Sequence, residues 1–469
     1  MTPPIATTTT QPIDPEPPGI HTIGTLRYDQ RALYVVFFWL MWNDFGITLI
    51  EQIGSLNGFL MRDLGASYMQ MTLIGSVGAF VLPWINPIVS TWSDRHRGRF
   101  GRRRPFLFFA APFFAVCLAS YPYMPGLYRY LMHHYHWMVA LSGHFPMHMK
   151  GEVIFMGISS LISGVFNGVL LAIFSYLYWD VVPLSVLGRF QSLSKIVAMI
   201  AALIWSFFIF GHGETGQHPR AVYVCTAIFA LVIYLISVWK IKEGEYPPPD
   251  QHKKGGFIAP VRAYFVECYS QPYYMWIFVA SWLYQTGNLA GMYQGFYLKE
   301  DLHMSLTMVG AINGWVNLAT TGFGMFFGFY IGGITDKLKP VRLVGPSYFI
   351  LAATVFGAFL FITGEWSAVG WGIARNIVSF GQGIIIGALT AELFPREKLG
   401  QFCSAQAVFY QVLNAIANPF IGDLFDHLKN NRLGYLWTAV FYALSGVAYL
   451  KVYSNWKKRH GLTPVPHAG

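Results

Sequence analysis

The sequence predicts an all-α integral membrane protein with about twelve transmembrane helices in two six-helix repeats. Three observations support this prediction: an apolar composition, a succession of long apolar runs, and motifs that recur in the second half of the chain. Of the 469 residues, 54% are hydrophobic and only 12% are charged, whereas a soluble chain carries about a quarter charged residues. So few charges cannot cover a soluble protein of this size, and we therefore expect a lipid bilayer to surround the chain.

The apolar runs are close to the roughly 20 residues that a helix needs to cross a bilayer. The predicted spans are 31–61, 70–92, 105–125, 153–179, 190–212, 219–241, 272–298, 306–331, 341–363, 367–391, 401–424 and 433–454.

The polar stretches between the runs predict the domain boundaries. Residues 1–27 are polar and rich in Pro and Thr, which predicts a disordered N-terminal tail. The longest polar interruption, 242–271, divides the spans six and six and predicts a cytoplasmic linker. It would join an N-terminal bundle over 28–241 to a C-terminal bundle over 272–456, which a short tail over 457–469 follows.

The net charge of +10 does not indicate a nucleic-acid partner, because the basic residues form short clusters between apolar runs. With both termini in the cytoplasm, most Lys and Arg residues fall on the inner side, as the positive-inside rule requires. We therefore expect a protein of the cell (inner) membrane with cytoplasmic termini.

Short motifs recur at corresponding places in the two halves. Ser93-Asp94-Arg95 follows the second span, and Thr335-Asp336-Lys337 follows the eighth. Asp180-Val181-Val182-Pro183 follows the fourth span, and Glu392-Leu393-Phe394-Pro395 follows the tenth. Two parallel six-helix repeats predict a binding site between the halves, near the middle of the membrane.

The recurring acids and bases suggest a gate at the inner face. An acid near a helix start can accept hydrogen bonds from backbone amides, and Arg pairs with carboxylates through two parallel bonds. A loop that only fixes orientation in the membrane is the alternative. The predicted cytoplasmic gate consists of Asp94, Arg95, Arg102, Arg103, Asp180 and Arg189 in the first half, and of Asp336, Lys337, Arg342 and Glu392 in the second.

The loop from Asp94 to Pro105, which ends Gly-Arg-Arg-Arg-Pro, resembles the motif of the major facilitator superfamily. In this longer form it is similar to the sucrose-type transporters and the glycoside–pentoside–hexuronide:cation symporters, as is the stretch from Asp180 to Phe190. The resemblance implies symport of a sugar or glycoside with a proton or sodium ion. The chain departs from the sucrose-type pattern at Gly164 and Ser175, where those transporters carry an Asp and an Arg.

The first span carries two acids within an apolar run, Asp44 and Glu51. They are seven residues apart, roughly two helical turns, and so share one face of a helix. An ionisable group in a membrane span is costly and usually marks a pathway or faces a partner. We predict that Asp44, Glu51, the neighbouring Asn43 and Arg375 of the tenth span bind the coupling ion or the substrate. A structural pair in the first span, and an Arg375 that reaches the membrane interface, are the alternatives.

Amides and aromatic residues within the spans suit a solute that carries hydroxyl groups. Amide groups match hydroxyls as donors and acceptors, and aromatic faces cover the apolar surface of a sugar ring. The alternative is that these amides join helices to one another. The predicted cavity residues are Asn167, Gln285, Asn288, Tyr293, Gln294, Asn313, Gln411 and Asn414.

No P-loop, nucleophile motif or zinc motif is present, so we expect neither an enzyme nor a cofactor or metal. Five histidines between the third and fourth spans are interpreted as a solvated outer loop: His133, His134, His136, His144 and His148. The sequence thus predicts a secondary transporter whose partners are a sugar-like solute, a coupling cation and the bilayer. A proton is preferred over sodium. The alternatives are an organic-anion carrier, an exporter or a non-transporting receptor.

Overall fold

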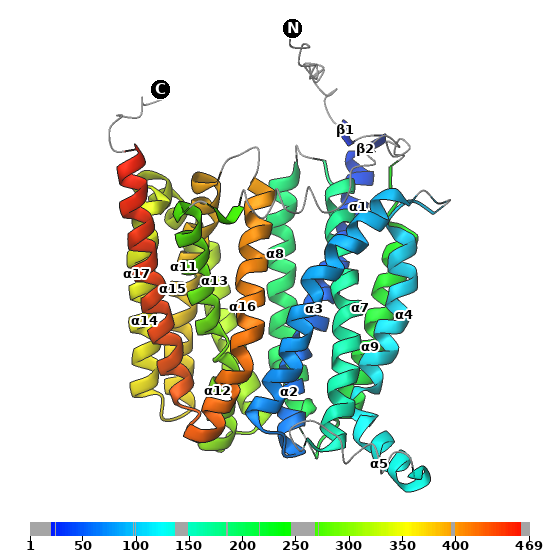
Figure 1. Cartoon of the computed structure of the whole chain (residues 1–469). Coiled ribbons are helices and arrows are strands. Elements are labelled where there is room, and N and C mark those ends of the chain that lie inside the picture. The colour runs from blue at the N-terminus through cyan, green and yellow to red at the C-terminus, as the bar shows by residue number, and fades with distance from the viewer. Residues whose placement is uncertain are drawn as a thin grey trace.

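The computed structural model describes residues 20–244 and 268–460, apart from 24, 97, 99, 137–148, 184–185, 215, 271 and 395–398. The helices stand side by side, and the first strand, β1, and the last residues of α17 lie at the same face, which we call the terminal face (Figure 1). The other end of the bundle, where α2, α5 and α12 lie, is called the opposite face. Most of the linker 242–271, including the stretch that joins the halves, lies outside the described residues.

Helices, some long and some short, account for all twelve predicted spans. In the first half they are α1 (Gln30–Gln52), α2 (Gly54–Asp63), α3 (Tyr68–Arg95), α4 (Arg104–Ser120), α5 (Met124–His134), α7 (Gly151–Val181), α8 (Leu187–Ile204) and α9 (Pro219–Lys240). In the second half they are α11 (Pro272–Asn288), α12 (Gly291–Phe296), α13 (Leu306–Leu338), α14 (Pro340–Phe361), α15 (Glu365–Leu393), α16 (Leu399–Leu428) and α17 (Leu433–His460).

Nine helices within the described residues are long and apolar enough to cross a membrane. The described apolar part of α3 is shorter, Tyr68–Leu82, and the seventh span is divided between α11 and α12. This architecture confirms the predicted all-α membrane fold.

The prediction that residues 1–27 are disordered is wrong for the last part of this segment, where two strands form. Strands β1 (Ile20–Ile23) and β2 (Leu26–Asp29) pair antiparallel, with Ile20 opposite Asp29. The Asp29 side chain then accepts a 2.8 Å hydrogen bond from the Ala32 amide and caps α1. Local pairing and this cap order the segment despite its polar composition. The remainder of the tail lies outside the described residues.

Helices of each half pack mainly on one another. Helix α4 packs on α7 and α9, and α1 on α8 and α9, while α14 packs on α15 and α17. The halves pack on each other where α3 runs along α16 and where α8 and the segments after it run along α13. The space between these pairs is where the repeat predicted a binding site.

Candidate functional site

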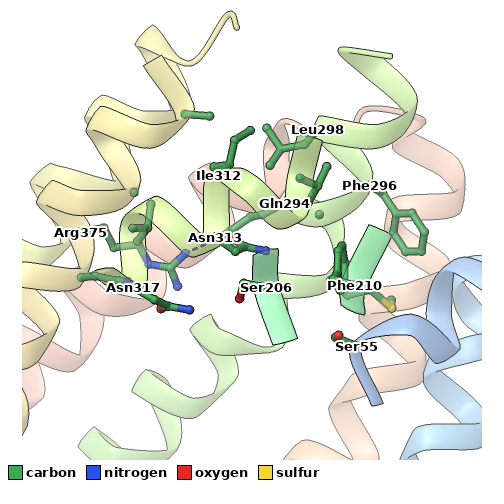
Figure 2. Close-up of a pocket in the computed structure, with 18 of the residues that line it drawn as sticks. Ser55, Ser206, Phe210, Gln294, Phe296, Leu298, Ile312, Asn313, Asn317 and Arg375 are labelled. Atoms are coloured by element: carbon green, nitrogen blue, oxygen red, sulfur yellow. Dashed lines mark hydrogen bonds between the residues drawn. The ribbon is translucent and has the colours of Figure 1, made fainter. Parts of the chain in front are cut away.

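A cavity of about 580 Å³ lies between the two halves. Residues of α1, of α2 and of the segments that follow α8 form one wall, and residues of α12, α13 and α15 contribute most of the other. Figure 2 shows Ser55, Ser206 and Phe210 of the first half facing Gln294, Asn313 and Arg375 of the second. The volume falls in the range of about 300–1,000 Å³ that is usual for small-molecule sites.

Three irregular backbone segments converge on this cavity. The first span, predicted as one helix, breaks at Ile53 between α1 and α2. The seventh span breaks between Asn288 and Gly291, the corresponding place in the second half. The eighteen-residue helix α8 continues as a π-helical segment, Trp205–Ile209. Discontinuous helices and π segments often frame binding sites in membrane proteins, since they expose backbone groups to the cavity.

Among the described residues of the cavity wall, Arg375 alone has a charged side chain. Its Nη1 donates a 2.6 Å hydrogen bond to Oε1 of Gln294, and the guanidinium also lies beside the Tyr442 hydroxyl. Gln294 is held in turn, because its Nε2 donates to the Thr438 hydroxyl at 2.9 Å. Among the described residues Arg375 forms no ion pair, so its charge is available to a solute.

Amides and aromatic rings make up much of the remaining wall. Asn313 and Asn317 of α13 lie one helical turn apart and point into the space beside Arg375. Trp205, Trp371 and Tyr435 contribute aromatic surfaces. Of the predicted residues, Gln294, Asn313 and Arg375 therefore lie together in this cavity.

The other predicted amides of the second half bond between helices instead. Oδ1 of Asn288 accepts a 2.6 Å bond from the Tyr442 hydroxyl, and Nδ2 donates to Gln285 at 3.2 Å. Asn414 accepts from the Thr286 hydroxyl at 2.9 Å. Tyr293 is fully buried and stacks on Phe425. With Gln411, which is partly buried, these residues do not line the central cavity. For Asn288 and Asn414 the structure shows the interhelical alternative.

The polar residues of the first span separate into different surroundings. Asn43 is fully buried and accepts a 2.8 Å bond from Ser237 of α9. The Asp44 carboxylate accepts a hydrogen bond from Ser194 of α8. Neither residue lines the central cavity. Glu51 instead lines a second cavity of about 140 Å³ inside the first half, which Asn167 of α7 also lines.

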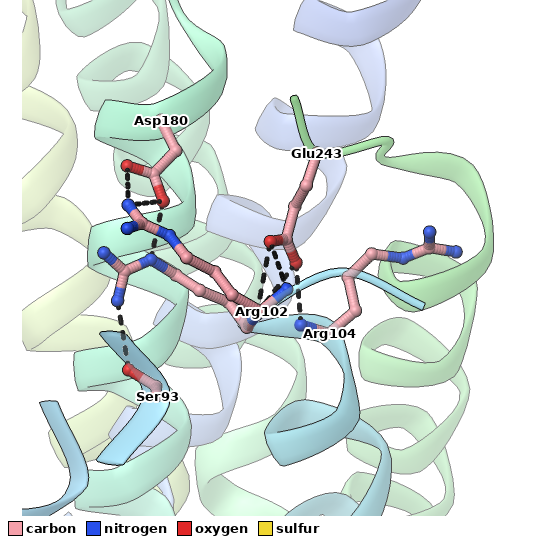
Figure 3. Close-up of polar contacts among 6 residues, drawn as sticks. Ser93, Arg102, Arg104, Asp180 and Glu243 are labelled. Carbon is pink, nitrogen blue, oxygen red and sulfur yellow. Dashed lines mark hydrogen bonds and ion pairs between the residues drawn. The ribbon is translucent and has the colours of Figure 1, made fainter. Parts of the chain in front are cut away.

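A charge cluster at the terminal face joins three segments of the first half (Figure 3). Nη2 of Arg102 lies 2.7 and 2.8 Å from the two carboxylate oxygens of Asp180, and Nε of Arg103 lies 2.6 Å from one of them. Arg103 also donates to Ser93 at 3.1 Å. These contacts tie the loop after α3 to the end of α7.

Glu243, which the sequence analysis missed, occupies the start of α4. Its carboxylate accepts bonds of 2.8–3.2 Å from the backbone amides of Arg102, Arg103 and Arg104. Gly101 before them has φ +95°, and a Cβ there would lie 2.9 Å from the same carboxylate. Glu243 reaches this place because the chain after α9 returns beside α4, and the prediction that Asp94 accepts bonds from a helix start stays a prediction. The side chains of Asp94, Arg95 and Arg189 lie outside the described part.

The described residues show only part of the corresponding cluster in the second half. Lys337, Arg342 and Glu392 are exposed, and the side chain of Asp336 lies outside the described part. Lys337 and Arg342 form no ion pair with any described residue. The predicted pairing of these two bases with Glu392 is therefore not found.

At the opposite face, polar contacts cross from one half to the other. Asp426 of α16 accepts 2.8 Å bonds from the backbone amides of Tyr68 and Met69, the first residues of α3. The Tyr68 hydroxyl donates to Asn431 at 2.6 Å. Two ion pairs, Arg62 with Glu300 at 3.1 Å and Lys299 with Asp63 at 3.3 Å, lie beside them. We call these residues the opposite-face lock.

The sequence carried a signal for this lock that went unused. Arg62-Asp63 and Lys299-Glu300-Asp301 are charged runs at the ends of the first and seventh spans, which correspond in the two repeats. Charges at matching ends of corresponding spans are candidates for pairing across the halves. No such signal marks Trp205 or Ser206, since both lie within an apolar run.

The family comparison agrees with this geometry. A family model described as the Major Facilitator Superfamily matches residues 32–418. The chain belongs to this superfamily. Superfamily members carry small-molecule solutes across membranes, and the central cavity lies between the two halves, where their solute sites are found. A comparison with curated proteins found no match.

Solved structures of the superfamily share the fold at low sequence identity. A bacterial homologue of the iron transporter ferroportin, in its inward-facing state, has a TM-score of 0.63 and 12% identity over 90% of this chain and 99% of that one. A peptide transporter of the POT type has a TM-score of 0.62 and 13% identity, over 93% of this chain and 96% of that one. A D-xylose–proton symporter has a TM-score of 0.59 and 15% identity, over 90% of this chain and 97% of that one. These neighbours carry different solutes, so the likeness concerns the fold alone.

Proposed function

We propose that this superfamily member is a secondary transporter that carries a sugar or glycoside together with a cation, by alternating access. The observation that carries the proposal is the central cavity, where Gln294, Asn313 and Asn317 lie among aromatic residues and beside Arg375. Amides donate to and accept from hydroxyl groups, and flat aromatic faces suit a sugar ring. One of the structural neighbours is a D-xylose–proton symporter, which agrees with this substrate class.

The transport cycle would be a rocking motion of two bundles, 28–241 and 272–456, around the cavity. The opposite-face lock holds the bundles together at one end and must break for the cavity to open there. We place the terminal face in the cytoplasm, because its loop after α3 carries the basic run Arg102-Arg103-Arg104. The membrane would be the inner cell membrane, and the cluster around Asp180 would belong to the cytoplasmic gate.

The carboxylates of the first span, Asp44 and Glu51, are the candidates for cation coupling. A proton is the first candidate, since a single carboxylate is enough to carry it, and sodium is the second. The proton or sodium ion would favour one state of the carrier only if it binds more tightly to that state than to the other.

One observation favours a second candidate, an organic-anion carrier. In the described part of the chain, Arg375 is the sole charged residue of the cavity wall, and no Asp or Glu lines it. A solute carboxylate could accept two parallel bonds from the guanidinium. A sugar acid would satisfy both candidates, and for this reason the test includes one.

Uptake into proteoliposomes tests the proposal. Wild-type protein receives a panel of monosaccharides, disaccharides, a hexuronic acid and simple organic acids, under an inward proton gradient and then an inward sodium gradient. We expect accumulation of a sugar, lowered about 10–100-fold in Arg375→Gln, since a hydrogen bond to a charged group contributes about 1.5–3 kcal/mol. Arg129→Gln on α5, outside the cavity, is the matched control. Accumulation of organic acids alone would replace the sugar assignment with the second candidate.

A further inference from the structure

The small cavity inside the first half has the composition of an ion site rather than a solute site. Its volume is about 140 Å³, well below the roughly 300 Å³ at which pockets for small molecules begin. A water molecule takes about 30 Å³ of liquid volume, so the space suits an ion with a few waters. Its walls come from α1, α2, α4 and α7, and all of these belong to one half.

Of the described residues that line this cavity, Glu51 supplies the only carboxylate, and none is Lys, Arg or His. Glu51 is exposed and lines the cavity, and among the described residues it forms no ion pair. Tyr121 in the wall and Tyr234 of α9 are the other titratable groups close to it. A carboxylate at membrane depth without a cation is costly, so it must take up a proton or bind a metal cation.

Side-chain oxygen atoms of α7 line the same cavity as Glu51. Oδ1 of Asn167 on α7 is buried and has no hydrogen-bond partner. Ser160 and Ser163 bring two hydroxyls from the same helix. Asn57 is already held, because its Oδ1 accepts from Tyr223 and its backbone carbonyl accepts from Tyr121. A buried oxygen that lacks a donor is expected to meet a cation or a water there, and hard cations prefer oxygen ligands.

The two cavities meet at the break in the first span. Gly54 lines both, while Glu51 lines the small cavity and Gln52 and Ser55 line the central one. A charge change at Glu51 therefore acts on the same short segment that forms a wall of the central cavity. Asp44 lies about two turns earlier, with its carboxylate bonded to Ser194.

We propose that the coupling cation binds in this small cavity, on Glu51 with the Asn167 oxygen and the serine hydroxyls of α7, apart from the solute. The proposal rests on the proposed function, cation-coupled symport. It assigns coupling to Glu51 and not to Asp44, and it makes the helix break at Ile53 the mechanical link between ion and solute.

The test separates coupling from solute translocation by two assays on the full chain in proteoliposomes. Gradient-driven accumulation needs the cation site, whereas solute counterflow without an ion gradient needs only the central cavity. In Glu51→Gln we expect accumulation to fall at least 10-fold while counterflow persists, with Glu152→Gln at the start of α7 as matched control. Preserved accumulation in Glu51→Gln, or a selective loss in Asp44→Asn, would overturn the assignment.

A rescue variant uses the geometry of the cavity. Gly164 lines it, and a Cβ at this position would meet no atom within 4 Å. Glu51→Gln/Gly164→Asp should therefore return a carboxylate to the same space and restore accumulation. Failure to restore it in a protein that still performs counterflow would argue that Glu51 acts by its position in α1 and not as a cavity ligand, which contradicts the proposal.

Direct binding distinguishes this proposal from the proposed function. Isothermal titration calorimetry measures the heat when sodium chloride is added to purified wild-type protein, with choline chloride as the control salt. Infrared difference spectra between acid and alkaline buffer record a protonated carboxyl. If Glu51→Gln abolishes the heat of sodium binding or the infrared band of the protonated carboxyl, the site is supported. This holds even where no sugar is transported, and in that case only the proposed function fails. A signal unchanged in Glu51→Gln overturns the site even where sugar symport is demonstrated.

Discussion

The two faces of the molecule use the same chemistry for different purposes. At the terminal face, Glu243 caps the start of α4 by accepting bonds from three backbone amides. At the opposite face, Asp426 caps the start of α3 by accepting bonds from Tyr68 and Met69. In each case a carboxylate lies where the helix dipole favours an anion.

The difference is which half supplies the carboxylate. Glu243 lies at the start of the linker, three residues after α9 ends, and both α9 and α4 belong to the first half, so this contact can persist while the halves move. Asp426 belongs to the second half and α3 to the first, so their contact exists only while the halves are together at that face. A helix cap thus stabilises a bundle in one place and a conformational state in the other.

The largest expected effect comes from removing the charge of the inter-half cap. Asp426→Asn weakens two hydrogen bonds to a charged group, each contributing about 1.5–3 kcal/mol, and should shift the population toward an open opposite face by more than about 10-fold. Spin labels at Arg129 on α5 and at His303 would report this as a longer distance in pulsed electron paramagnetic resonance. An unchanged distance distribution would contradict the role of Asp426 as a lock.

The matched variant is Glu243→Gln, which removes the charge of the intra-half cap. We expect a lower melting temperature of the purified protein, because the amides at the start of α4 lose an ionised acceptor, and no change in the distance between the labels. A shift in that distance would show that the terminal-face cluster also senses the state of the carrier.

The next effect is that of the pairs within the terminal-face cluster. Asp180→Asn leaves Arg103, which is only 5% exposed, without its carboxylate. Removing one partner of a buried pair costs up to about 3–5 kcal/mol, and we expect about 2 kcal/mol here because Asp180 remains partly accessible. Guanidinium or thermal unfolding measures this loss. Asp423→Asn, from an exposed pair with His427, is the control and should change stability little.

Much of the fold could be predicted from the sequence, because membrane helices are specified by length and apolarity and the repeat fixes their pairing. Within the site, Gln294, Asn313 and Arg375 were found as polar residues inside apolar runs, and all three line the central cavity. Asn288 and Asn414 have the same appearance in sequence but bond to Tyr442 and Thr286. Packing between spans that are distant in the sequence decides which helix an amide contacts. The composition of the span that carries the amide does not predict this contact.

The broken helices and the lock could be predicted only in part. The predicted span 31–61 is longer than the roughly 20 residues that a bilayer requires, and this excess is where α1 ends and α2 begins. Glu243 and Asp426 are single acids near helix ends, and nothing in their local sequence names the helix that they cap. Their partners, Arg104 and Tyr68, lie 139 and 358 residues away along the chain.

The smallest expected effect concerns the two ion pairs beside the inter-half cap. In Arg62–Glu300 the side chains are 32% and 30% exposed, and in Lys299–Asp63 they are 16% and 30% exposed. Pairs this accessible contribute about 0.2–1 kcal/mol and are screened by salt. Asp63→Asn should therefore raise the population with an open opposite face, read from the label distances, by less than about 5-fold at low salt. At high salt the change should not be measurable. The reverse arrangement, Asp63→Lys with Lys299→Asp, should restore the low-salt population. A salt-independent effect as large as that of Asp426→Asn would mean that the ion pairs, and not the helix cap, hold the opposite face together.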